Sequence, residues 1–195
     1  MTTETTQTPD IYGRWATMSA ETGNSRQMTA NATQLAAHWR RCSLSSDFWA
    51  HYISLFIPPT VPQERLRRTD VESVLAYLLN ELFENCAKFS SGDHQTVHYT
   101  SWLGDDELIF QVTNHILPEG QAPFVAKIKE MLDNDPHELY FQRLEENVEL
   151  GLDSSGLGYL TLIKDFGVAF GFRFHTLGNG STAVDVQAKV SLLEE

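Results

Sequence analysis

The hydrophobic pattern is strongest between residues 69 and 89, where apolar side chains recur at helical spacing. At 3.6 residues per turn these positions fall on one face of a helix. The apolar face comprises Val71, Leu75, Leu78, Leu79, Leu82, Cys86 and Phe89. Glu81, Asn85 and Lys88 are spaced i, i+4 and i+7 and line one shoulder of that face. The pattern predicts a helix packed on a core, with a carboxylate, an amide and an ammonium at its edge. The alternative is a solvated helix face, on which Glu81 and Lys88 are too far apart to form an ion pair.

The chain before this helix shows a weaker and mixed pattern. Proline and glycine clusters mark its boundaries, and polar residues mark its helix caps. The expected segments are a short strand at 11–18, a turn at 23–25, a helix at 29–41, a short aromatic helix at 48–56 capped by Ser46 and Asp47, an extended connector at Pro58, Pro59 and Pro62, and an N-cap at Thr69 and Asp70 for the helix that ends near Phe89.

The chain after the helix alternates between strand and helix patterns. The expected segments are strands at 96–103 and 107–113, a loop at 114–120, helices at 122–132 and 137–150, a glycine- and serine-rich loop at 151–158, a short helix at 157–166, and strands at 168–176 and 182–192. Strands grouped in hairpins with helices between them predict an α+β fold, a two-layer sandwich with helices on one face of a mixed, mainly antiparallel sheet. Four strands are expected, with a fifth from the N-terminus.

The length of the chain suits one domain at residues 11–195, after a disordered lead at 1–10 that is rich in threonine. Within it, residues 11–68 form an N-terminal part and residues 69–192 a core. No signal-peptide pattern and no bilayer-length apolar run occur, and Cys42 and Cys86 are too few for a disulfide framework. We therefore expect a cytoplasmic protein, with Cys86 as a buried small hydrophobic residue.

The charge of the chain disfavours some classes of function. The chain has 26 acidic and 14 basic residues and a formal net charge of -12. Such a balance disfavours nucleic-acid binding, which requires a basic surface. His94 and His98 have no third ligand nearby in the sequence, which disfavours a zinc site.

Two groups of residues could carry phosphate chemistry. A carboxylate such as Glu81 can accept a proton from a hydroxyl, and the Asn85 oxygen can bind Mg²⁺. Lys88 would then reach phosphate oxygens. Ser154-Ser155-Gly156-Leu157-Gly158 runs into a helix, whose N-terminal N–H groups favour an anion. An ordinary glycine-rich N-cap, which is common, is the alternative for this second segment.

These motifs together resemble the GHKL (Bergerat-fold) ATPases, which include histidine-kinase ATP domains, gyrase-type ATPases and anti-sigma-factor serine kinases. The segment Asn80-Glu81-Leu82-Phe83-Glu84-Asn85-Cys86-Ala87-Lys88-Phe89-Ser90 resembles their N-box. The segment Ser155-Gly156-Leu157-Gly158 resembles their second glycine box. Gly178-Asn179-Gly180-Ser181-Thr182 resembles the G-x-G-T entry to their last strand. The order and spacing agree across residues 69–192.

The resemblance implies a role for each matching residue. It makes Glu81 the base that activates a Ser or Thr hydroxyl, Asn85 the ligand of Mg²⁺, and Lys88 a phosphate contact. It also implies that Asn114 and Thr182 bind the nucleotide. Ser155, Gly156, Leu157 and Gly158 would form the phosphate loop, with the amides around Gly156 and Gly158 as its donors. The implied cofactors are ATP and Mg²⁺.

One motif departs from the family pattern. Members carry D-x-G-x-G after the second of these strands, where this chain has Asn114-His115-Ile116-Leu117-Pro118. An asparagine oxygen can accept the adenine amino proton, although without charge. The loss of both glycines removes backbone freedom at positive φ. This departure motivates an alternative in which the fold is kept as a nucleotide-free protein-binding module.

The small size and the altered glycine box resemble stand-alone bacterial regulators, similar to anti-sigma-factor or SiaB-like serine kinases. The resemblance implies a signalling regulator that acts by partner switching on a STAS-type antagonist or sigma-like factor. If the activity is kept, the regulator would be a protein serine/threonine kinase. A homodimer is a further expectation, because small regulators of this group often dimerise. The aromatic segment 48–56 is interpreted as core, with a dimer surface as the alternative.

Overall fold

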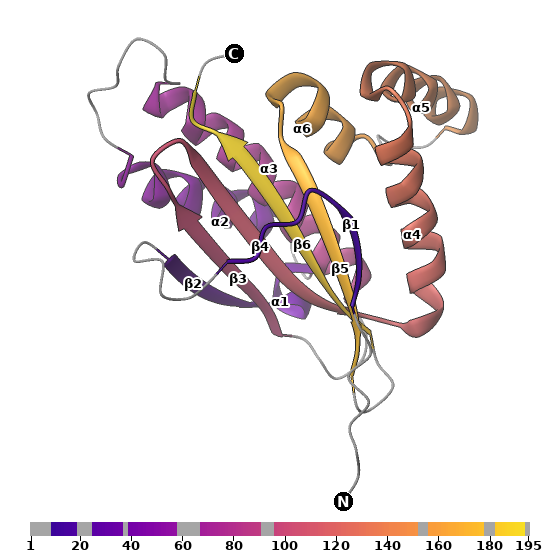
Figure 1. The fold of residues 1–195 in the computed structure, drawn as a ribbon, viewed down its shortest axis with the longest axis horizontal. Coiled ribbons are helices and arrows are strands. Elements are labelled where there is room, and N and C mark those ends of the chain that lie inside the picture. The colour runs from indigo at the N-terminus through magenta and orange to yellow at the C-terminus, as the bar shows by residue number, and fades with distance from the viewer. Residues whose placement is uncertain are drawn as a thin grey trace, which may run out of the picture.

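The computed structural model describes residues 9–18, 25–36, 39–57, 67–90, 96–151, 156–177 and 182–193. These residues form a sheet with helices packed mainly behind it (Figure 1). The strands are β1 (Asp10–Gly13), β2 (Ser25–Asn31), β3 (Thr96–Leu103), β4 (Glu107–Ile116), β5 (Ala169–Thr176) and β6 (Thr182–Ser191). The helices are α1 (Ala32–Ala36), α2 (Trp39–Ser54), α3 (Arg68–Phe89), α4 (Pro118–Asp133), α5 (Pro136–Leu150) and α6 (Gly158–Phe166).

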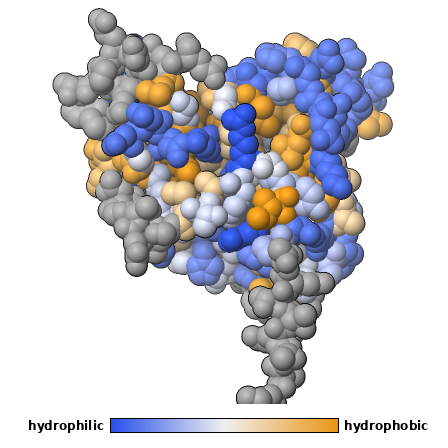
Figure 2. Space-filling view, viewed as in Figure 1, coloured by the Kyte–Doolittle hydropathy of each residue, from blue (hydrophilic) through white to orange (hydrophobic). Residues whose placement is uncertain are grey.

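The sheet confirms the expected α+β architecture. Its strand order is β1-β5-β6-β4-β3-β2, and every neighbouring pair is antiparallel. The central strand β6 is buried along most of its length, as expected for a strand covered on both sides. Helices α2 and α3 lie behind the sheet in Figure 1, and residues 14–18 cross its front. Figure 2 views this front face, where hydrophilic side chains gather over α4 and α5 at the upper right.

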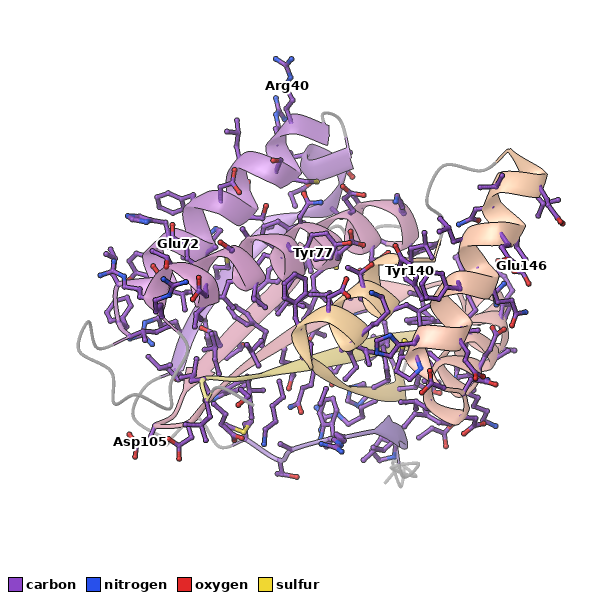
Figure 3. All side chains as sticks on the ribbon, turned by 90° about the horizontal axis from the view of Figure 1, so that it is seen from above. Arg40, Glu72, Tyr77, Asp105, Tyr140 and Glu146 are labelled. Carbon is purple, nitrogen blue, oxygen red and sulfur yellow. The ribbon has the colours of Figure 1, made fainter. Side chains whose placement is uncertain are left out.

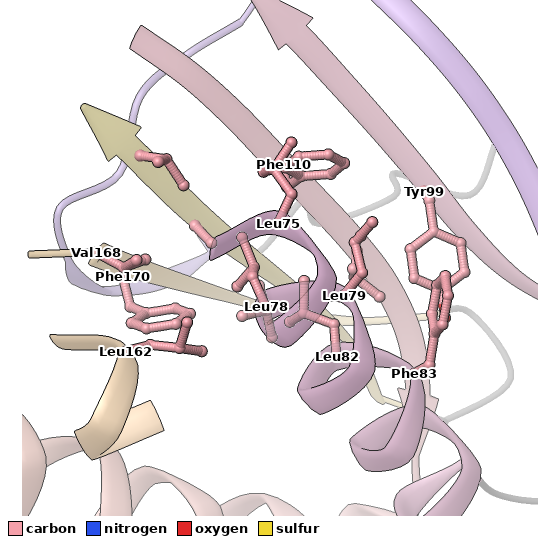
Figure 4. Packing of buried hydrophobic residues seen from close by; sticks show 14 of the residues in the cluster. Leu75, Leu78, Leu79, Leu82, Phe83, Tyr99, Phe110, Leu162, Val168 and Phe170 are labelled. Atoms are coloured by element: carbon pink, nitrogen blue, oxygen red, sulfur yellow. The ribbon is translucent and has the colours of Figure 1, made fainter. Parts of the chain in front are cut away.

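The core lies between α3 and the sheet, which is the role that the hydrophobic pattern predicts for this helix. Four leucines of α3 face the sheet, and the ring of Phe83 meets Tyr99 edge-on at 4.9 Å between centroids (Figure 4). The leucines are Leu75, Leu78, Leu79 and Leu82, each almost fully buried. Burial of one such side chain contributes roughly 1.5–3 kcal/mol. Cys86 is buried as expected, whereas Phe89 at the helix end is 59% exposed.

The N-terminal part differs from the sequence prediction in four places. The helices expected at 29–41 and 48–56 are replaced by the short helix α1 and the single longer helix α2. Residues 25–31 form strand β2, where a turn and the start of a helix were expected, because their pairing with β3 overrides the weak helical pattern. The predicted strand at 11–18 is limited to β1. Ser46 and Asp47 lie inside α2 and do not cap it. The buried Ser46 hydroxyl donates to the Ser43 carbonyl at 2.7 Å, so the serine is accommodated within the helix.

Two boundaries also differ near the predicted site. Helix α3 starts at Arg68 with Arg67 at the N-cap position, so Thr69 and Asp70 fall in its first turn. Strand β4 continues to Ile116, because it stays paired with β6 up to Thr182, and α4 starts at Pro118. The expected loop at 114–120 is therefore wrong. The proline connector at 58–62 lies outside the described residues.

Candidate functional site

Helix α6 packs against α3, and its first residue meets the predicted catalytic carboxylate. Gly158 lies so close to Glu81 that an added Cβ would come within 3.0 Å of Glu81 Cγ and would overlap the carboxylate. A larger residue here would require the Glu81 side chain to move. The structure brings together two residues that the motif resemblance places in one site, although they are far apart in the chain.

The contact between α3 and α6 continues along α3 in steps of one helical turn, and Figure 3 labels Tyr77 on this helix. Tyr77 lies one turn before Glu81, with its ring 6.0 Å from the ring of Phe166 and its hydroxyl near Thr161. Asn85 lies one turn after Glu81, and its amide hydrogen-bonds with the Tyr159 hydroxyl. Tyr77, Glu81 and Asn85 therefore form one seam of α3 that α6 covers.

Tyr159 is the residue of this seam that sequence reasoning missed. Its ring packs against Phe170 at 4.7 Å, and burial raises the pKa of its hydroxyl, so the group stays neutral at physiological pH. The Tyr159 hydroxyl uses one of the hydrogen-bonding positions of the Asn85 amide. The sequence offered one indication of its role. Tyr159 directly follows Gly158 at the start of a short apolar helix, where an aromatic side chain is expected to pack toward the core.

The surroundings of Glu81 shift the pKa of its carboxyl group. Burial raises the pKa of the Glu81 carboxyl, the nearby Glu84 raises it further, and Lys88 acts in the opposite direction. Lys88 does not pair with Glu81. Its ammonium contacts Glu84 at 3.2 Å on the exposed side of the helix, where Asn80 also donates to Glu84 at 2.9 Å.

The predicted adenine end lies at the C-terminal end of α3. The buried Asn114 accepts two hydrogen bonds at Oδ1, one from the Ser90 hydroxyl at 2.6 Å and one from the His115 amide at 2.8 Å. Thr182 lies at the same end of the sheet, because Asn114 is paired with Val184 and Ile116 with Thr182. The Thr182 hydroxyl donates to Gln121 of α4 at 3.2 Å. The structure thus places Asn114 and Thr182 near each other.

The glycine loop is described from Gly156 onward, and Ser154 and Ser155 lie outside the described residues, as do His94 and residues 178–181. Gly156 has a φ of 82°, a value that favours glycine, and an added Cβ there would meet nothing within 4 Å. Leu157 is buried, and the backbone turns into α6 at Gly158. An open backbone at a helix N-terminus is suited to an anion.

The residues fit ATP and Mg²⁺ better at the phosphate end than at the adenine end. Gly156 and Gly158 offer backbone N–H groups, and Asn85 offers the type of oxygen ligand that Mg²⁺ accepts beside phosphate oxygens. At the other end, the Asn114 oxygen already serves two donors. Among the residues that the structure describes, no group of three or more His, Cys, Asp or Glu side chains is arranged to hold a metal ion.

Comparison with known proteins gives a likeness of fold. No protein-family model matches the sequence, and no curated protein sequence matches it significantly. A chain in the crystal structure of the SiaB–SiaC complex from Pseudomonas aeruginosa is similar, with a TM-score of 0.52 and 13% identity. The match covers 84% of this chain and 89% of that chain. The likeness is one of fold. Within the described residues, no helix has the length and apolarity needed to cross a membrane.

Proposed function

We propose that the protein is a signalling regulator of the partner-switching type, which binds a second regulatory protein and phosphorylates a serine or threonine of it with ATP. The observation that carries this proposal is the contact between Glu81 and Gly158, because it joins the predicted base to the predicted phosphate loop. The fold likeness to a chain of the SiaB–SiaC complex supports a role in a complex of two proteins.

Each residue at the phosphate end has a task in this proposal. Bound ATP would supply the phosphoryl group, with Mg²⁺ to neutralise charge on its phosphates. Glu81 accepts the proton of the partner hydroxyl at its carboxylate, and its raised pKa makes that carboxylate a stronger base. Asn85 would hold Mg²⁺ through its side-chain oxygen, and the amides at Gly156 and Gly158 would bind phosphate oxygens.

A matched pair of variants tests the proposal. Mg-ATP at about 100 times its Kd should stabilise the wild-type protein by roughly 2.7 kcal/mol, measured as a rise in Tm. Asn85→Ala should lose most of this rise. Glu81→Gln should keep it but should no longer transfer phosphate to a STAS-type protein in a radiolabel assay. The absence of any Tm shift at millimolar Mg-ATP would exclude a nucleotide-dependent function.

The adenine end favours a second candidate, a nucleotide-free protein-binding module. Asn114 is engaged by Ser90 and His115, and strand β4 followed by α4 occupies the segment where the family carries a glycine-rich loop. This candidate predicts that Asn85→Ala binds the partner protein as tightly as wild type, with or without ATP. Partner binding that depends on ATP and is lost in Asn85→Ala contradicts it.

A further inference from the structure

Among the strands that the structure describes, β2 forms an edge of the sheet, and it lacks the usual protection. It is the last strand in the sheet order, and its seven residues pair with β3 without interruption. Natural proteins protect such edges with short strands, prolines, bulges or outward charges, because unpaired N–H and C=O groups recruit another strand. The opposite edge follows this rule, since β1 has only four residues and ends at Gly13.

Strand β2 has none of these features. Ser25–Asn31 contains no proline and no glycine. The charged side chain of β2 is Arg26, and its guanidinium lies 3.6 Å above the ring centroid of Phe56, so it does not guard the edge. The outward-facing residues Gln27 and Thr29 are exposed and neutral. Within the described part of the chain, the outer side of β2 pairs with no strand, so a partner strand can add to it.

An exposed aromatic ladder lies beside this edge. Phe48, Tyr52 and Phe56 follow each other at intervals of four residues on and just after α2, with ring centroids 6.5 Å and 5.2 Å apart. Phe48 is 61% exposed, and Tyr52 and Phe56 are exposed as well. An open hollow between the ladder and β2 is lined by Arg26, Gln27, Phe48, Trp49 and Tyr52. An apolar surface of this kind marks an interaction site.

We propose that this surface binds a second copy of the chain, with the two β2 strands paired antiparallel around a twofold axis at Met28. This register pairs all seven residues and places no like charges opposite each other. The facing pairs are Ser25 with Asn31 of the partner subunit, Arg26 with Ala30 of the partner subunit, Gln27 with Thr29 of the partner subunit, and Met28 with Met28 of the partner subunit. The sheet then continues through both subunits.

The same twofold symmetry also covers the exposed aromatic ladder. A twofold axis perpendicular to the sheet keeps the α2 helices of both subunits on one face, so the two ladders face each other across the axis. One occupant thereby covers both the strand edge and the exposed aromatic rings. A strand from an unrelated protein would satisfy the edge, but it would not by itself bring an apolar surface to the ladder.

Charge is compatible with this pairing. The chain carries a net charge of -12, yet β2 and α2 contain Arg26, Arg40 and Arg41 against Asp47. Two copies therefore meet without opposing clusters of carboxylates.

Oligomeric state is the first test. Light scattering on a sizing column and sedimentation equilibrium should give twice the monomer mass for the wild-type protein at tens of micromolar. A monomer at that concentration overturns the proposal. Phe48→Glu should give a monomer, because it places a charge in the joined ladders, whereas Val148→Glu on α5, at a residue 75% exposed, should stay dimeric. A dimer of unchanged strength in Phe48→Glu also overturns the proposal.

A pair of double variants tests the register without touching the core. In the proposed register, Gln27→Lys with Thr29→Lys sets two lysines opposite each other, and the dimer should weaken at least tenfold. Gln27→Glu with Thr29→Lys sets a glutamate opposite a lysine at the same positions, and the dimer should persist. Equal dissociation constants for the two double variants contradict the register. Because both residues are exposed, circular dichroism should show both variants folded.

A disulfide provides a direct geometric readout. Met28→Cys should form a covalent dimer under mild oxidation, because residues facing each other in antiparallel strands have Cα separations that suit a disulfide. Gln27→Cys is the matched control, since its Cα would be displaced by two residues from its symmetry mate. Cross-linking of Gln27→Cys but not of Met28→Cys overturns the register. Cys42 and Cys86 are buried and do not compete.

Discussion

The Ser90 hydroxyl donates a hydrogen bond to Asn114 Oδ1 at 2.6 Å, which ties the end of α3 to β4 beside the start of β6. The resemblance assigns the same asparagine to adenine. An adenine amino group would therefore compete with Ser90 and the His115 amide for one oxygen. The hydrogen bonds within the protein and the proposed bond to adenine thus require the same acceptor. Replacing Asn114 by a charged aspartate tests whether adenine also binds there.

Asn114→Asp should tighten ATP binding under the proposed function. A carboxylate can accept hydrogen bonds from Ser90, from the His115 amide and from adenine, and bonds to an ionised acceptor are roughly twice as strong. We expect a gain of about 1 kcal/mol, or roughly fivefold in Kd, measured by isothermal titration calorimetry. Asn134→Asp, at the exposed C-cap of α4, is the control and should leave the Kd unchanged. An unchanged Kd for Asn114→Asp removes Asn114 from the adenine site.

Gly158→Ala should destabilise the protein by about 1 kcal/mol, because the new methyl group overlaps the Glu81 carboxylate and the Glu81 side chain must rotate to make room. Urea unfolding monitored by circular dichroism measures the loss. Gly120→Ala is the control, since an added Cβ there meets nothing within 4 Å, and it should be neutral or stabilising by up to about 1 kcal/mol.

The cause of the Gly158→Ala effect can be isolated with a double variant. Glu81→Ala removes the carboxylate that the new methyl group meets, so Gly158→Ala should cost far less in that background than in wild type. A coupling free energy of about 1 kcal/mol or more between the two changes is expected for residues in contact. Additive free energies would show that Gly158 is required for some reason other than Glu81.

The sequence predicts α3, β3 and α5 almost to the residue, because each combines a strong periodicity with a clear boundary. The Leu pattern defines α3, the Gly104 turn ends β3 at Leu103, and Pro136 opens α5. The chemical site is predicted in part for a different reason. The Glu81–Gly158 contact follows from the order of two motifs, and periodicity alone would not bring those residues together.

Other features depend on tertiary contacts that leave little local trace. Strand β2 exists because β3 offers it a partner, while its own sequence is compatible with a helix. The bond between Asn85 and Tyr159 depends on how α6 rotates about its axis as it packs on α3. The two donors to Asn114 depend on how far β4 continues, which its pairing with β6 decides.

Glu81→Gln should make the protein more stable near neutral pH, with a gain that disappears in acid. Burial raises the pKa of Glu81 in the folded state above its ordinary value of 4.5. The folded state then binds a proton more tightly than the unfolded state, so wild-type stability falls as pH rises above that ordinary value. Glutamine carries no charge and has no such loss. Urea unfolding of both proteins across this pH range measures the difference, and an equal gain at every pH contradicts the mechanism.

Glu146→Gln is the control with the opposite sign. The pKa of the Glu146 carboxyl is lowered by its hydrogen bond to Gln142 and by Arg143, whose guanidinium lies 2.7 Å away. Its contribution to stability is present above its ordinary pKa of 4.5 and is lost as pH falls through the lower folded value. Glu146→Gln should therefore be the less stable protein near neutral pH, and the difference should shrink in acid.

Asp185→Asn should destabilise the protein more than any substitution considered above. The Asp185 side chain is 3% exposed on β6 and accepts hydrogen bonds from Thr113 at 2.6 Å and from Arg173 at 2.7 and 2.9 Å, with His175 at 2.6 Å. Removal of one partner from a buried pair typically costs 3–5 kcal/mol, because the remaining charge is left uncompensated. We expect about 3 kcal/mol, since Arg173 keeps some contact with water. Asp105→Asn in the exposed turn should change the free energy of unfolding by less than about 0.5 kcal/mol. If urea unfolding gives Asp185→Asn and Asp105→Asn the same stability, the cluster does not hold β4, β5 and β6 together.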